Sequence, residues 1–164
     1  ETIFLLAAYH GNVPLLKWLL EHGSSIWENN SQKQNCLLLS AWGGHLDAVK
    51  WLVQYNKSLI GEKCISGNTA LLYAAQGGHT EIVKWLLHHG GRLDQKNKKK
   101  YTCLLLAAKK GNIDLVKWLL THGSYINESD NRGNTSLLLA SSKGYFELVK
   151  WLLCHGSLIS EKKL

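Results

Sequence analysis

Residues 67–90 read GNTALLYAAQGGHTEIVKWLLHHG, and this stretch decides the fold because the chain repeats it. Its Lys-Trp-Leu step recurs with spacings of 33, 34, 33 and 33 residues, at Trp18, Trp51, Trp85, Trp118 and Trp151. Sixteen residues before each Trp stands a residue suited to begin a helix: Thr2, Asn35, Thr69, Thr102 and Thr135. A fixed period of this length indicates stacked structural repeats, and the 164-residue chain is predicted to hold five of them.

Each repeat is predicted to form two short helices. The Thr69 hydroxyl can cap the first helix of its repeat, and Gly78 breaks the chain before the second. The second helix ends before a glycine, or before Asn56 in one repeat, residue types that tolerate a left-handed C-cap. A polar connection of roughly ten residues follows, long enough for a β-hairpin-like finger. A lone helix pair cannot bury its apolar faces, so the predicted fold class is an all-α solenoid of stacked helix-turn-helix units.

These features resemble the ankyrin repeat over essentially the whole chain. The resemblance rests on the period, the Thr at the helix start, Leu-Ala-Ala followed by Gly-His, the Ile-Val-Lys and the glycine before the finger, and it is closest at residues 67–71 and 77–84. It implies one ankyrin-repeat domain, residues 1–164, with repeats at roughly 1–28, 29–61, 62–95, 96–128 and 129–161. The chain begins with Glu1, has no Met and is apolar at both outer repeats, so it is expected to be a fragment of a longer protein.

Three departures from the family pattern carry expectations of their own. The family's usual His is replaced by Leu, which exchanges a hydrogen-bond network for apolar burial, at Leu5, Leu38, Leu72, Leu105 and Leu138. Lys33 and Lys100 replace the glycine of the finger turn, so these two tips are expected to need another turn geometry. The extra residue of the 34-residue spacing is predicted to form a loop insertion between Asn56 and Thr69.

Composition and charge narrow the function classes. Apolar residues make up 45% and charged residues 19%, so neither a disordered chain nor a coiled coil is expected. The uncharged apolar stretches are too short to span a bilayer, so no membrane insertion is predicted. The net charge is +7, and residues 92–117 hold eight basic residues against two acidic ones. This imbalance suggests an acidic partner.

Neither catalysis, a metal nor a cofactor is predicted. Histidines share one slot at the end of the second helix, about 8–10 Å apart in a stack and too far for one zinc ion, so they are expected to cap helices: His22, His89, His122 and His155. No base is placed beside a nucleophile, so the chain is expected not to be an enzyme. Cys36 and Cys103 lie two repeats apart, too far for a disulfide. Free thiols predict a reducing compartment, the cytoplasm, or a host cytosol for a chain from an intracellular bacterium or parasite.

The predicted binding residues occupy slots that vary while the rest of the repeat stays constant. In ankyrin-like arrays, finger tips and the ends of the first helices line a concave groove. Carried onto this chain, those slots predict partner-binding residues at Tyr9, His10, Gln34, Trp42, Asn68, Gln76, Lys98, Lys99, Tyr101, Lys109, Lys110, Arg132, Asn134 and Lys143. The repeated Trp is instead predicted to cover the seam between repeats, with an aromatic docking ridge as the alternative.

The leading hypothesis is a monomeric, non-enzymatic protein–protein interaction module that binds a partner protein or peptide of acidic character in its groove. A second hypothesis is nucleic-acid or polyphosphate binding through the basic residues 92–117, with Tyr101 stacking on a base. No nucleic-acid-binding motif accompanies that charge, which makes nucleic acid the less expected partner. A third is a structural or targeting segment of a larger effector or enzyme.

Overall fold

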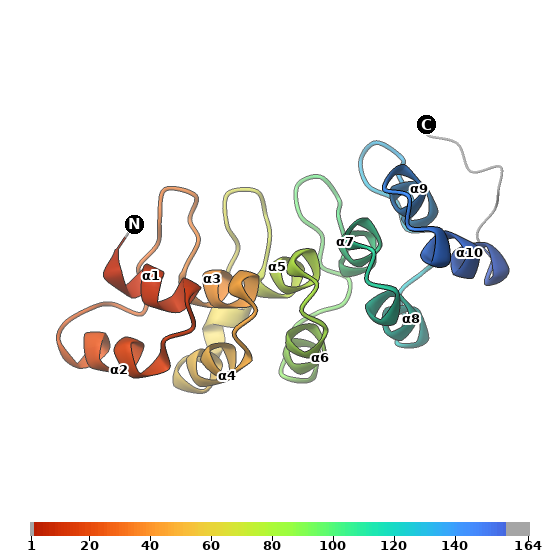
Figure 1. The fold of residues 1–164 in the computed structure, drawn as a ribbon. Coiled ribbons are helices and arrows are strands. Elements are labelled where there is room, and N and C mark those ends of the chain that lie inside the picture. Colours follow the sequence, from red (N-terminus) through yellow and green to blue (C-terminus); the bar gives the residue numbers. More distant parts are fainter. Residues whose placement is uncertain (1, 157–164) are drawn as a thin grey trace. The chain divides into compact units, whose positions relative to one another are not determined.

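A computed structural model of the chain describes residues 2–156. The chain divides into two compact units, Glu1–Gly91 (unit 1) and Arg92–Leu164 (unit 2). The predicted all-α helical-repeat solenoid is confirmed, and the described residues contain no β-strand. Unit 1 holds three helix pairs and a 3-10 helix (Figure 1): α1 (Ile3–Tyr9), α2 (Val13–Glu21), α3 (Cys36–Gly43), α4 (Leu46–Tyr55), η1 (Lys57–Gly61), α5 (Ala70–Gly77) and α6 (Thr80–His88). Unit 2 holds two described pairs: α7 (Cys103–Lys110), α8 (Ile113–Thr121), α9 (Ser136–Ser142) and α10 (Phe146–Cys154). The boundaries predicted for five repeats stay predictions.

Within each unit the first and second helices form separate layers. In unit 1, α3 packs between α1 and α5, while α4 packs between α2 and α6, and the long loops project from the first-helix layer (Figure 1). In unit 2, α7 packs on α9. The leucines that replace the family's His are fully buried in four repeats and half-buried at Leu138. Apolar burial at this slot, predicted from the sequence, therefore contributes to the core.

The predicted helix ends are present with one exception. Each first helix begins at a side-chain cap, whose oxygen accepts a hydrogen bond from the backbone N–H three residues on: Thr2, Asn35, Thr69, Thr102 and Thr135. Asn56, expected in a left-handed C-cap, is instead extended, with φ −148°. Its Oδ1 accepts from the Ser58 N–H at 3.1 Å and so caps η1. The loop insertion is thus a 3-10 helix that buries Leu59 and Ile60.

The fingers at residues 30–34, 97–101 and 130–134 are tight turns, each built around one side-chain acceptor. Asn97 Oδ1 accepts 3.0 Å bonds from the N–H groups of Lys99 and Tyr101, and Asn30 and Asp130 act in the same way in their own fingers. Expecting a different turn at Lys33 and Lys100 was wrong, because they adopt φ of 55° and 60°, the left-handed conformation that Gly67 and Gly133 have at the same slot. The fingers are hairpin-like, and a single antiparallel bridge, Ser129 to Thr135, is their only ladder element among the described residues.

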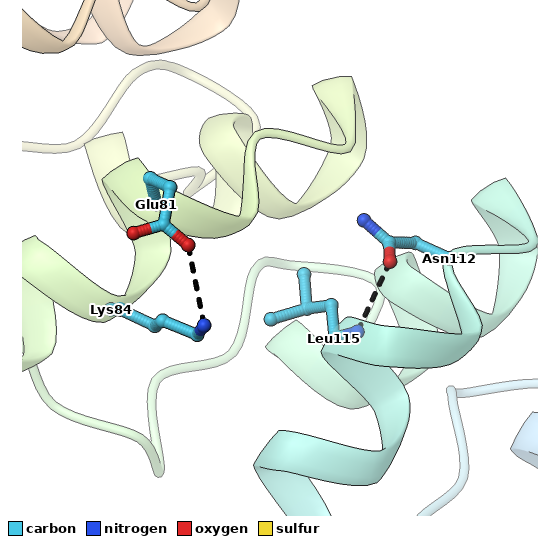
Figure 2. Close-up of polar contacts among 4 residues, drawn as sticks. All are labelled: Glu81, Lys84, Asn112 and Leu115. Atoms are coloured by element: carbon cyan, nitrogen blue, oxygen red, sulfur yellow. Dashed lines mark hydrogen bonds and ion pairs between the residues drawn. The ribbon is translucent and has the colours of Figure 1, made fainter.

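Aromatic rings pack between neighbouring helix pairs inside each unit. The ring of His45 packs on Gly11, the ring of His79 packs on Gly44, and the ring of Tyr145 packs on Gly111, where a Cβ would lie 2.8 Å from the ring. These breaks need glycine both for their positive φ and for the space that the ring occupies. Directly before α8, the slot of these rings holds Asn112, whose Oδ1 accepts from the Leu115 N–H at 3.0 Å (Figure 2).

Candidate functional site

Three aromatic side chains of unit 1 lie in an aromatic row: Tyr9, Trp42 and Tyr73. Trp42 meets Tyr9 edge-on, with centroids 6.1 Å apart, and stacks on Tyr73 at 5.6 Å and 23°. Trp42 is 42% exposed although one face of its indole is covered by the buried Tyr73 ring. His10 lies edge-on to Tyr9 at 5.2 Å, and Gln76, at the end of α5, is exposed. The structure therefore brings the predicted residues Tyr9, His10 and Trp42 together.

Tyr73 was not predicted as part of the site, yet its hydroxyl holds the row in place. It accepts a hydrogen bond from Gln34 Nε2 at 2.7 Å and donates to Cys64 Sγ at 3.4 Å. Burial raises the pKa of Tyr73, and the bond to Cys64 adds to that rise. Burial acts to raise the pKa of Cys64 as well, but the hydrogen bonds that Cys64 shares with Ser66 and Tyr73 outweigh it and leave that pKa lowered.

Two predicted binding residues are internal. Gln34 is 8% exposed because its amide reaches inward to Tyr73, and Asn68 is 7% exposed and donates to Ser66 Oγ at 3.3 Å. Their side chains hold the fingers together, so a partner would not reach them. We therefore leave Gln34 and Asn68 out of the candidate site, as a correction to the prediction.

Unit 2 presents exposed cations at the corresponding slots. This basic surface consists of Lys98, Lys99, Lys109, Lys110, Arg132 and Lys143. Lys109 Nζ lies 4.9 Å from the centroid of the Tyr101 ring, a cation–π contact. Tyr101 is half-buried, and its pKa is raised by burial and by the hydrogen bond that its hydroxyl donates to Asp130.

Asp130 is a buried carboxylate within the finger of this basic surface. Its Oδ2 accepts from Asn134 Nδ2 at 2.7 Å, and its Oδ1 accepts from the N–H groups of Arg132 and Asn134. Burial acts to raise the pKa of Asp130, but these hydrogen bonds outweigh it and leave the pKa lowered. The carboxylate therefore stays ionised near neutral pH and holds Asn134 and Tyr101 in position from within.

The repeated Trp residues form ring pairs on the second helices. Trp85 and His89 stack at 3.7 Å and 12°, and three further Trp–His pairs have nearly the same geometry, with Tyr55 replacing His beside Trp51. The Nδ1 atom of each stacked His lies 2.8 Å from the Trp carbonyl oxygen, so these histidines cap the helix ends as predicted. Trp18 is 53% exposed, and the other four Trp are half-buried.

The cysteines and histidines form no metal-binding group in the part of the chain that the structure describes. No group of three His, Cys, Asp or Glu side chains there could hold a metal ion. All four cysteines are free, and burial raises the pKa of Cys36 to about 12. A thiol with that pKa is not ionised at neutral pH and is a poor nucleophile.

Antiparallel helix pairs in register, joined by hairpin-like fingers, define a helical-repeat protein. The family model described as ankyrin repeats (3 copies) matches residues 4–97 and 89–163, so the chain belongs to the ankyrin repeat family. Ankyrin repeats are generally protein–protein interaction modules, and the family is typically non-enzymatic. No curated protein matches the sequence. Among residues 2–156, no helix combines the length and the apolar character needed to cross a membrane.

Proposed function

We propose that this chain is a non-enzymatic module that docks a partner protein or peptide, with Trp42 as the anchor. The observation that carries the proposal is the aromatic row, in which an exposed indole rests on a buried and hydrogen-bonded phenol. A side chain already held in place loses little conformational freedom on binding. Trp and Tyr are also the residues that most often dominate the energy of protein interfaces.

The basic surface of unit 2 supports a partner of acidic character. Its six cations are exposed, and the carboxylate of Asp130, in the same finger as Arg132, is turned inward to its own hydrogen-bond donors. Complementary charge of this kind speeds encounter and selects partners more than it adds affinity. We therefore expect the basic surface to govern the association rate and Trp42 to govern the dissociation rate.

Nucleic-acid binding is less well supported at the same surface. That hypothesis needs the Tyr101 ring as a platform for a base. One face of the ring is taken by Lys109, and the hydroxyl is held by Asp130. A protein or peptide partner does not need that platform, because exposed lysines can meet its carboxylates directly.

The test compares two exposed tryptophans. Peptides are selected from a random library displayed on phage against the full chain, and the affinity of the best one is measured by calorimetry for Trp42→Ala and Trp18→Ala. Trp18 is the matched control, because it is at least as exposed as Trp42 but lies in the second-helix layer. We expect Trp42→Ala to weaken binding by about tenfold or more and Trp18→Ala to leave it unchanged.

Charge is tested on the same peptide. Reversing Lys109 and Lys110 to Glu is expected to slow association and to reduce its dependence on salt. Selected peptides without acidic residues, or equal affinity for wild type and Trp42→Ala, would contradict the proposal. Tight binding of single-stranded nucleic acid that these lysine changes abolish would favour the second hypothesis instead.

A further inference from the structure

A pocket of about 290 Å³ opens in unit 1. It lies in the second-helix layer, which is on the side away from the fingers (Figure 1). It is lined by Val53 and Gln54 of α4, Lys57 of η1, Trp85 of α6, and His89, which directly follows α6. None of these residues belongs to the aromatic row or to the basic surface. The pocket is therefore a feature separate from the proposed docking site.

Two departures of the second repeat from the other repeats explain why the pocket lies here. Two residues after the repeated Trp, this repeat has Val53, whereas the others have a leucine: Leu20, Leu87, Leu120 and Leu153. The shorter Val53 is buried and leaves room beside the Trp85 ring. Lys57 is the other departure, because the same slot holds Ser24, Gly91 and Ser124 in three other repeats.

The pocket has an aromatic wall. The Trp85 and His89 rings are stacked at 3.7 Å and 12°, and His89 Nδ1 is bound to the Trp85 carbonyl oxygen at 2.8 Å. A carbonyl oxygen only accepts, so Nδ1 carries the hydrogen and the imidazole is fixed in orientation. Val53 supplies an apolar floor next to these rings. A planar apolar group of a ligand would find a matching surface here.

The remaining lining is cationic and polar. The stem of Lys57 reaches the end of α6, where a Cβ on Gly90 would lie 4.0 Å from Lys57 Cε. Lys57 forms no ion pair with any described residue, whereas Lys84 on α6 is paired with Glu81 at 3.2 Å (Figure 2). Gln54 adds an amide donor, and no carboxylate lines the pocket. These groups would meet a carboxylate on a ligand.

We infer that this pocket binds an aromatic side chain of a partner peptide in which the next residue is acidic. The aromatic ring lies against Trp85 and His89, and the neighbouring carboxylate meets Lys57 and Gln54. A peptide fits better than a free small molecule, because a pocket this small and open cannot enclose most of a free ligand's surface. The flanking backbone of a peptide instead gains further contacts with α4 and α6.

The inference is tested by NMR on the full chain, with acetyl-Gly-Phe-Asp-Gly-amide as the probe. We expect saturable shifts of the Trp85 indole N–H signal, with a dissociation constant on the order of 1 mM for so short a peptide. Replacing the peptide's Phe by Ala, or its Asp by Asn, is expected to weaken binding by about fivefold or more. No shift of the Trp85 signal at peptide concentrations well above that dissociation constant would overturn the inference.

Two variants borrow residues from other repeats, so the fold is expected to persist. Val53→Leu fills the pocket and is expected to abolish the shifts, while Lys57→Ser is expected to remove the preference for Asp over Asn. Lys63→Ser is the matched control, because Lys63 is exposed and lies outside the lining. Undiminished binding by a Val53→Leu variant with a native spectrum would overturn the inference, as would free N-acetylphenylalanine binding as tightly as the peptide. Trp42→Ala leaves this pocket intact. The experiments can therefore distinguish a failure of the pocket inference from a failure of the proposed docking site at Trp42.

Discussion

Units 1 and 2 share the same helix-pair architecture but expose different side chains on it. At the end of the first helix, unit 1 exposes Trp42 where unit 2 exposes Lys109. At the third position of a first helix, Leu72 of α5 and Leu105 of α7 are both fully buried. The comparison shows that the slots used in packing are nearly constant, and that the residues able to meet a partner occupy slots that packing leaves free.

The largest expected effect tests the shared frame. Leu72→Ala in unit 1 and Leu105→Ala in unit 2 are each expected to lower the free energy of unfolding by about 2–5 kcal/mol, because each leaves a cavity in a closed core. Urea denaturation followed by circular dichroism measures both. A small effect in one unit beside a large effect in the other would show that the two cores are not equivalent.

Acid stability is expected to separate the units, because the finger slot of Cys64 in unit 1 holds Asp130 in unit 2. The folded pKa of Asp130 is lowered, so its contribution is complete above the unfolded value of about 3.9 and is lost as the pH falls through the folded value. The chain is therefore expected to lose stability as acid protonates Asp130.

Asp130→Asn isolates this effect, because it keeps the Oδ1 acceptor that Asn30 and Asn97 use in their fingers. Urea midpoints of wild type and variant, compared from neutral to acidic pH, should converge as the pH falls. A difference between them that stays constant over the whole range would exclude Asp130 as the source.

A smaller effect concerns the residue after the capping Thr. Ser136 Oγ is buried and has no hydrogen-bond partner among the described residues, whereas unit 1 has Ala70 in the same slot. Ser136→Ala is expected to raise the free energy of unfolding by about 1 kcal/mol, because it removes an unsatisfied buried hydroxyl. Ser40→Ala is the opposite case, since Ser40 Oγ donates to the Ala8 carbonyl oxygen at 2.9 Å. Thermal denaturation should show a gain for the first variant and a loss for the second.

The smallest effect is expected where the units agree. Lys33→Gly in unit 1 and Lys100→Gly in unit 2 should each stabilise the chain by about 0.5 kcal/mol, because glycine adopts a positive φ without steric cost, although it loses more entropy on folding. Lys99→Gly removes a charge from the same finger without that relief and is expected to be neutral or slightly destabilising. Equal effects of Lys99→Gly and Lys100→Gly would mean that charge, and not backbone strain, is responsible.

Much of the fold was predictable because its determinants are local. The caps at Thr69 and its equivalents, the glycine breaks and the leucine core follow from residues a few positions apart in one repeat. The conformation of Asn56 was not predicted, because the choice between a C-cap and the start of a 3-10 helix depends on burying Leu59 and Ile60. The left-handed conformation of Lys33 and Lys100 was not predicted, because the hydrogen bonds to the Asn side chains of their fingers outweigh the strain of a positive φ.

The candidate site was less predictable because it depends on contacts between repeats. Exposure of Trp42 could be expected from a variable slot, but its support by Tyr73 requires two neighbouring helices in place. A signal was present, since Tyr73 is the single aromatic residue in a slot that otherwise holds leucine: Leu6, Leu39, Leu106 and Leu139. Gln34 has its amide taken up by the hydroxyl of that same Tyr73, and the sequence of one finger does not reveal this bond.

The rings that pack on glycines bear on how such arrays grow and diverge. Every repeat has a glycine at its helix break: Gly11, Gly44, Gly78, Gly111 and Gly144. The glycine on which a ring packs is thus present in every repeat. A repeat that carries a ring such as His45 or Tyr145 can therefore be copied next to any other by unequal crossing-over. Substitution of the break glycine is not tolerated, since a side chain on Gly11 would clash with His45 of the following repeat. Duplication of a repeat therefore preserves this contact, while the neighbouring repeat constrains substitution of the glycines.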